Sequence, residues 1–181
     1  MDNDQTQPVP SDPNNKPKEP VVDQMRLQML MQQIRDEQNL LMGVMGGAAA
    51  ALVGAVAWGL VTYFTGWQIG VMSIGVAFIV GWSVRKFGKG VDQVYGIIGA
   101  SLSLCGSVLG NYFALCMVIA DQEGVFFTEI LESLDISIAI DLMVQTFTPI
   151  DILFYGLALY YGYKYSIRDL TEEETKSIQR A

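Results

Sequence analysis

The pattern of apolar and polar residues divides the chain into long uncharged runs separated by short charged segments. No charged residue occurs from Leu40 to Val84 or from Gln93 to Ala120. Roughly 20 helical residues cross a bilayer core, so the first run holds two spans and the second holds one. A shorter apolar stretch, Pro149 to Tyr163, supplies a fourth. The chain is therefore predicted to be an all-α polytopic membrane protein with four transmembrane helices, at about residues 40–64, 67–84, 93–120 and 149–165.

Polar segments flank this membrane domain, which we place at residues 40–168. Residues 1–20 hold five of the six prolines and almost nothing apolar, which predicts a disordered tail. In residues 21–39 apolar side chains recur at helical spacing without glycine or proline, so we expect an amphipathic helix that runs directly into the first span. Residues 169–181 predict a helical tail, because Thr171 and Glu174 have the spacing of a capping box.

The connection between the third and fourth spans, residues 121–147, alternates apolar and acidic side chains. Glu129, Glu132 and Asp135 step by three along one side of a helix, opposite an apolar side. This predicts an amphipathic helix on the membrane surface. Acids at this spacing are able to share a calcium ion, but the turn carbonyls and glycine-shaped loop of such sites are missing, so we favour a solvated face. The expected apolar side consists of Phe127, Ile130, Leu131, Leu134 and Ile138.

Basic residues are confined to three places: the amino-terminal segment, the "RKFGKG" turn that begins at Arg85, and the chain after the fourth span. Because basic residues near span ends stay in the cytoplasm, both termini are predicted to be cytoplasmic and residues 121–147 to lie outside. The basic residues expected at the membrane interface are Arg85, Lys86, Lys89 and Lys164.

The "GKG" in this turn invites comparison with a phosphate-binding loop. Such a loop needs a glycine five residues before its Gly-Lys pair and a hydroxyl residue after it. Ser83 and Gly90 occupy those two positions, so we expect a cytoplasmic turn instead.

Small residues crowd the first and third predicted spans. Gly106 and Gly110 form a GxxxG pair, and the series Gly99, Ser103 and Ser107 steps by four. Small side chains let helix backbones approach closely in a membrane. The spacing leaves open whether these contacts join helices of one chain or of neighbouring copies. The expected packing residues are Gly46, Gly54, Gly99, Ser103, Gly106, Ser107 and Gly110.

Chemistry-bearing motifs are missing from the sequence. The chain has no histidine, and Cys105 and Cys116 would lie about 16 Å apart along one helix, too far for a disulfide. Asp151 follows Thr148 and Pro149, which is typical of a helix N-cap. We therefore expect no enzyme activity, cofactor or metal site. A net charge of −8 without a basic stripe also argues against nucleic-acid binding.

The run from Gly66 to Gly110 contains "GWQIGVMSIG" and "VRKFGKG", followed by a span rich in small residues. In this pattern it resembles small uncharacterised bacterial four-helix inner-membrane proteins. The resemblance covers about a quarter of the chain. It implies a location in the bacterial inner membrane and brings no activity, cofactor or site residue.

Two functional hypotheses follow. The first is a non-catalytic accessory or scaffolding subunit of a membrane complex. It lies in the lipid bilayer and associates with other membrane proteins or with itself through the small-residue helix faces, while its cytoplasmic segments or outer helix engage partners. The alternative is a small oligomeric transporter or channel. Its polar path would include Gln68, Ser107 and Asn111.

Overall fold

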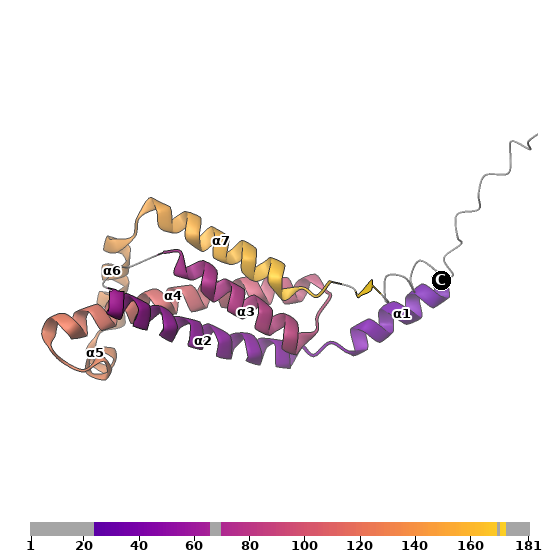
Figure 1. Cartoon of the computed structure of the whole chain (residues 1–181), viewed down its shortest axis with the longest axis horizontal. Coiled ribbons are helices and arrows are strands. Elements are labelled where there is room, and N and C mark those ends of the chain that lie inside the picture. Colours follow the sequence, from indigo (N-terminus) through magenta and orange to yellow (C-terminus); the bar gives the residue numbers. More distant parts are fainter. Residues whose placement is uncertain (1–23, 66–69, 170, 173–181) are drawn as a thin grey trace, which may run out of the picture. The chain divides into compact units, whose positions relative to one another are not determined.

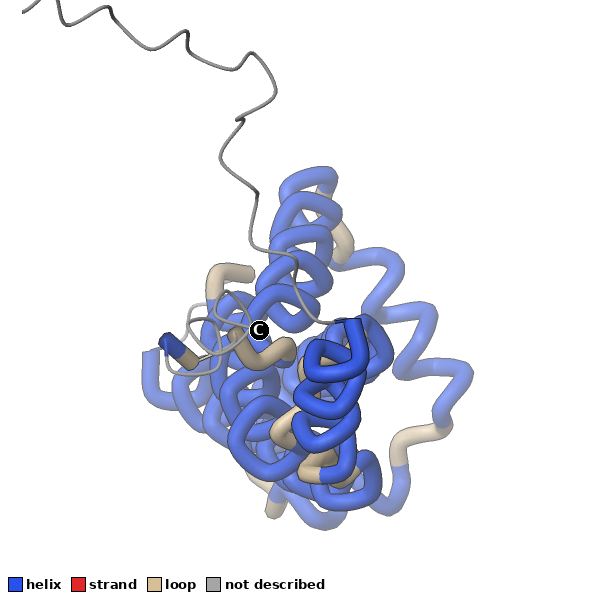
Figure 2. The backbone as a smooth tube through the Cα atoms, turned by 90° about the vertical axis from the view of Figure 1, so that its right-hand side faces the viewer, coloured by secondary structure: helices blue, strands red, loops and turns tan. Residues whose placement is uncertain are grey.

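The computed structural model describes residues 24–65, 70–169 and 171–172, and in these ranges the regular structure is helical throughout (Figures 1 and 2). The all-α prediction is confirmed. The helices are α1 (Gln24–Asp36), α2 (Leu40–Thr65), α3 (Met72–Gly88), α4 (Gln93–Glu123), α5 (Phe127–Ser133), α6 (Ile136–Thr146) and α7 (Pro149–Ser166).

The chain divides into two compact units, and the one formed by Ile34–Asp169 contains α2 to α7. Every contact described below lies within this unit. Of the other unit, the structure describes the part of α1 up to Gln33 and two residues near the carboxyl terminus. The predicted disordered tail (1–20), Gln68 and most of the predicted carboxyl-terminal helix lie outside the described residues.

Four helices form a bundle in which α3 and α4 lie between α2 and α7 and contact both (Figure 1). Neighbours alternate in direction along the chain. Gly43 at the start of α2 meets Gly88 at the end of α3, while Gly99 near the start of α4 meets Ser166 at the end of α7. The starts of α2 and α4 and the ends of α3 and α7 therefore lie at the same end of the bundle.

The core of the bundle is built from small and β-branched side chains. Ala55, Ala77, Val80, Val84 and Ala114 are all fully buried. Such residues occupy little space between helices, so the backbones approach closely. The outward faces carry exposed leucine, valine and phenylalanine, as expected for helices in contact with lipid.

Within the described ranges two helices, α2 with 26 residues and α4 with 31, are long and apolar enough to cross a membrane. A third span is present if α6 and α7, which are bent by 107°, count as one. The other two predicted spans form helices in the expected places, but these helices are too short or too polar to count as membrane-crossing helices. α3 has 17 residues with Arg85 and Lys86 in its last turn, and α7 contains five tyrosines, Asp151 and Lys164.

The expectation that residues 21–39 form a helix continuous with the first span is wrong. α1 ends at Asp36 and α2 begins at Leu40. The break has a local cause, because the side-chain Oδ1 of Asn39 accepts a hydrogen bond from the backbone N–H of Met42 at 3.0 Å. Asn39 thus satisfies one of the free amides at the start of a new helix.

The single amphipathic helix expected in residues 121–147 is also wrong, since two short helices, α5 and α6, replace it. Gly124, with φ of 69°, ends α4. Asp135 begins α6, because its Oδ1 accepts hydrogen bonds from the backbone N–H of Ser137 at 2.8 Å and from the Ser137 hydroxyl at 2.5 Å. Hydrogen bonding to Ser137 lowers the pKa of the Asp135 carboxyl below its ordinary value.

Replacement of Asp135 by alanine is expected to loosen the first turn of α6, which would appear as faster hydrogen exchange of its amides. In wild type the ionised cap should support this turn above the ordinary pKa of about 3.9 and lose its effect as pH falls through the lowered native value. Exposed Asp141, in the middle of α6, provides the control, and Asp141→Ala should leave these amides unchanged. Equal exchange in both variants would contradict the cap.

Candidate functional site

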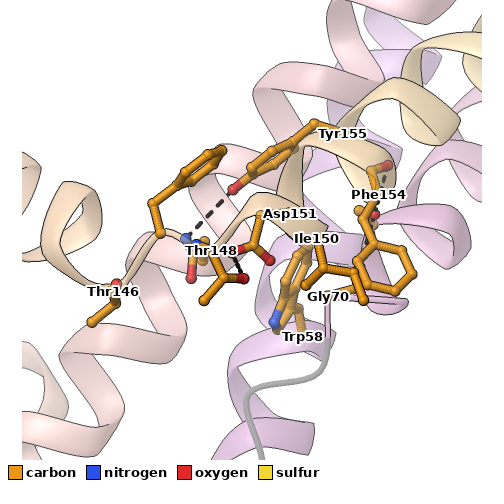
Figure 3. A pocket seen from close by; sticks show the side chains of 11 residues that line it. Trp58, Gly70, Thr146, Thr148, Ile150, Asp151, Phe154 and Tyr155 are labelled. Atoms are coloured by element: carbon orange, nitrogen blue, oxygen red, sulfur yellow. Dashed lines mark hydrogen bonds between the residues drawn. The ribbon is translucent and has the colours of Figure 1, made fainter.

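A cavity of about 330 Å³ opens at the end of the bundle where α6 turns into α7 (Figure 3). Its wall is formed by α2, the start of α3, α4 and the α6–α7 connection with the first turns of α7. The residues that line it are Trp58, Gly70, Ser73, Asn111, Thr146, Phe147, Thr148, Ile150, Asp151, Phe154 and Tyr155.

The start of α7 places a carboxylate in this wall. Asp151 Oδ2 accepts hydrogen bonds from the backbone N–H of Thr148 at 2.8 Å and from its hydroxyl at 2.7 Å. Pro149 occupies the first helical position, where a missing N–H costs nothing. The predicted cap is confirmed, and it holds the Asp151 side chain in one orientation beside the cavity (Figure 3).

Aromatic rings form much of the remaining wall. Phe147 and Tyr155 are stacked with ring centroids 6.1 Å apart. The Nδ2 of Asn111 donates a hydrogen bond to the Tyr155 hydroxyl at 3.4 Å, which links α4 to α7. Trp58 is 3% exposed, and its indole Nε1 has no hydrogen-bond partner among the described residues.

A buried serine closes the wall between α3 and α7. The hydroxyl of Ser73 lies 2.8 Å from the carbonyl oxygen of Gly70 and 3.1 Å from that of Phe154. At Gly70 the chain before α3 comes close to α7. A Cβ on this residue would stand 2.5 Å from the Phe154 ring and 3.2 Å from Asp151 Oδ1. The glycine therefore lets the chain before α3 pack closely against Phe154 and Asp151 of α7.

The structure describes two of the three members of the predicted polar path. Asn111 lines the cavity, whereas Ser107 is fully buried and donates a hydrogen bond to the carbonyl oxygen of Ser103 at 2.9 Å. Gln68 lies outside the described residues. Towards the other end of the bundle, Val76 and Val80 fill the space between the helices. The two described members thus do not line one continuous opening.

The predicted packing residues on α4 face other helices of the same chain. A Cβ on Gly99 would overlap the Ser166 side chain of α7, and Ser103 lies against Gly162 of α7. On another side of α4, a Cβ on Gly106 would stand 3.0 Å from the Cβ of Ala51, and one on Gly110 would stand 2.8 Å from Trp58; both partners belong to α2.

The two glycines predicted to pack in the first span also face another helix of the same chain. Gly46 faces Phe87 of α3, with 2.5 Å between a built Cβ and the ring, and Gly54 faces Val76 of α3 at 3.2 Å. In this structure these contacts join helices of one chain.

The four basic residues expected at the membrane interface lie at the opposite end of the bundle from the cavity. Arg85 pairs with Asp169 at 3.2 Å. The Nζ of Lys86 stands 4.7 Å from the ring centre of Trp82, and that of Lys164 stands 5.8 Å from the ring centre of Tyr160. Lys89 is exposed and ends α3 in a left-handed conformation.

A second hollow of about 290 Å³ shares Asn111, Phe147 and Tyr155 with the first. Its remaining lining is aliphatic and comes from α4 and α6. These residues are Val108, Ile140, Met143 and Val144. Neither hollow was predicted from the sequence. The available signal was the number of aromatic residues around the α7 cap, and such residues are also typical of a membrane boundary.

Among the described residues no group of three or more acidic or cysteine side chains is arranged to hold a metal ion. Cys105 and Cys116 are both free. Comparison with protein-family models, curated proteins and solved structures finds no match to this chain.

Proposed function

We propose that the protein is an accessory or scaffolding subunit of a bacterial inner-membrane complex, with four spans, cytoplasmic termini and no catalytic role. The segregation of charge supports this topology. Basic side chains gather where α3 and α7 end, while residues 121–141 at the other end hold six acids and no base. Positive residues near span ends mark the cytoplasmic side.

The observation that carries the proposal is the exposure of α5 and α6. Of all their residues only Ala139 is buried. Ile136 and Val144 are 68% and 67% exposed, and Phe126, just before α5, is 77% exposed. Large apolar side chains that are left uncovered at this density mark a contact with another protein or with a membrane.

The charge on these helices indicates the chemistry of the partner. Glu129, Glu132, Asp135 and Asp141 are exposed beside the apolar side chains. Such a surface complements a basic and apolar outer face of another membrane protein, and like charges would repel it from anionic lipid. The small-residue faces are occupied within the chain, so we assign partner binding to α5 and α6.

Transport is the weaker hypothesis. A path between copies of the chain would need polar side chains on the outward faces of the helices. Ser103 and Ser107 are instead fully buried inside the chain.

The test is gentle detergent extraction of the natively expressed protein, followed by mass analysis of the intact particle. We expect recovery of another membrane protein in fixed ratio. The double variant Glu129→Lys/Glu132→Lys should lower that recovery about tenfold, since like charges would then meet across the interface.

The control is the same charge reversal at Asp36, which is exposed at the end of α1. Asp36→Lys should leave the recovery of the companion unchanged. A particle that contains only copies of this chain would overturn the accessory role, and equal losses in both variants would overturn the assignment to α5.

A further inference from the structure

The two hollows that share Asn111, Phe147 and Tyr155 differ in character. The first contains a carboxylate, hydroxyl groups and an amide, whereas the second adds only the aliphatic side chains of α4 and α6. The first hollow, here called the chamber, has a volume of about 330 Å³, and the second, the groove, has about 290 Å³. Because they share three lining residues, they lie side by side, and the pair suits a molecule with a polar head and a hydrocarbon tail.

The charges in and around the chamber favour a ligand whose head group is positively charged. Among the described residues that line the chamber, Asp151 is the only acid or base. From Gly90 to Tyr163 the sequence contains no lysine or arginine, and six acids lie in residues 121–141. Their summed field draws cations to this end of the bundle.

The carboxylate is available to a ligand. Thr148 donates two hydrogen bonds to Oδ2 of Asp151, and no described residue donates a hydrogen bond to Oδ1. Gly70 lies close to Oδ1, since a Cβ built on it would stand 3.2 Å from that oxygen. In Figure 3, Asp151 lies between Thr148 and Ile150, with Trp58 and Gly70 nearby.

Four of the described residues that line the chamber are aromatic: Trp58, Phe147, Phe154 and Tyr155. Aromatic faces attract an ammonium group through the ring quadrupole, most strongly where water is excluded. Aromatic rings around a single carboxylate are therefore suited to an organic cation and unsuited to an anion.

We propose that this double hollow binds a lipophilic amine, with the ammonium head against Asp151 and the aromatic rings, and the hydrocarbon tail along Val108, Ile140, Met143 and Val144. A phospholipid with an amine headgroup fits less well, because its phosphate would lie beside Asp151 and the described lining residues include no lysine or arginine. The inference is independent of the accessory role, since it concerns the purified chain alone.

The experiment is equilibrium dialysis of radiolabelled octylammonium against the full chain in an uncharged maltoside detergent, with binding to empty micelles subtracted. We expect saturable binding of one molecule per chain. Excess 1-octanol, which has the tail without the charge, should displace it poorly.

Two pairs of variants test the head and the tail separately. Asp151→Asn keeps an acceptor for the Thr148 N–H and should weaken binding about tenfold, whereas Asp141→Asn on exposed α6 should not. Val144→Trp places a bulky side chain in the groove from a position that is 67% exposed, so it should block the tail without disturbing the core. Val53→Trp on α2, at 65% exposure, is its control.

Each contrary outcome has a definite meaning. Failure to saturate, or equal affinity in wild type and Asp151→Asn, would overturn the site. Displacement by short-chain phosphatidylethanolamine at concentrations no higher than those of octylammonium would overturn the choice of ligand in favour of a lipid headgroup.

Discussion

Replacement of Gly99 by alanine is expected to lower the free energy of unfolding by about 2 kcal/mol. The added Cβ would overlap the Ser166 side chain and stand 2.5 Å from the carbonyl oxygen of Gly162, both on α7. Ser166 is fully buried and donates a hydrogen bond to that same carbonyl at 2.6 Å, so it has no free space to enter. Overpacking of this kind costs up to about 3 kcal/mol, and the helix preference of alanine returns about 1 kcal/mol.

Unfolding by sodium dodecyl sulfate in a mild detergent measures the loss. Gly156 on α7 and Gly75 on α3 are matched controls, because a Cβ at either position meets nothing within 4 Å. Alanine there should be neutral or slightly stabilising. If Gly99→Ala and Gly156→Ala gave the same midpoint, the close approach of α4 and α7 would be refuted.

The helices of the bundle were predictable because their signals are local. The uncharged run that begins at Leu40 predicts α2 to within one residue of its observed end at Thr65. Thr148, Pro149 and Asp151 fix the start of α7 in the same way. Long apolar segments and capping side chains act on their own neighbourhood, so no knowledge of packing is needed to place them.

The outer connection was mispredicted because its apolar periodicity continues through a break. Leu134 and Ile138 keep the spacing of one helix, yet Asp135 adopts an extended conformation and caps a new one. An acid in mid-helix and an acid at an N-cap look alike when the surrounding pattern is amphipathic.

The candidate site was the least predictable part, because it depends on which helices meet. Asn111 was singled out as a polar residue within a span, but its partner Tyr155 lies 44 positions further along the chain. For the small residues, the residues themselves were predicted but their partners were not. Spacing alone identified Gly106 and Gly110, whereas the identity of their partner, Ala51 and Trp58 of α2, required the arrangement of the bundle.

The glycines of the basic turn pack against Tyr95, and replacing Gly90 is therefore expected to lower the stability of the protein strongly. A Cβ on Gly90 would clash with the ring of Tyr95, which is 4% exposed, and one on Gly88 would stand 2.7 Å from that ring. The carbonyl oxygen of Gly90 also accepts a hydrogen bond from the N–H of Arg168 at 2.8 Å. The turn is thereby fixed to α4 and to the chain after α7.

Gly90→Ala is expected to destabilise the protein by about 3 kcal/mol, because a ring with so little exposed surface cannot move aside. Tyr95→Ala alone should cost a similar amount through the lost ring. Since the alanine at position 90 would occupy part of the space that the ring vacates, the double variant should be about 2 kcal/mol more stable than the sum of the two single effects predicts. Pairing Gly90→Ala with Tyr63→Ala, at the opposite end of the bundle, should be additive. Additivity in both pairs would mean that the glycine serves the conformation of the turn and not its contact with Tyr95.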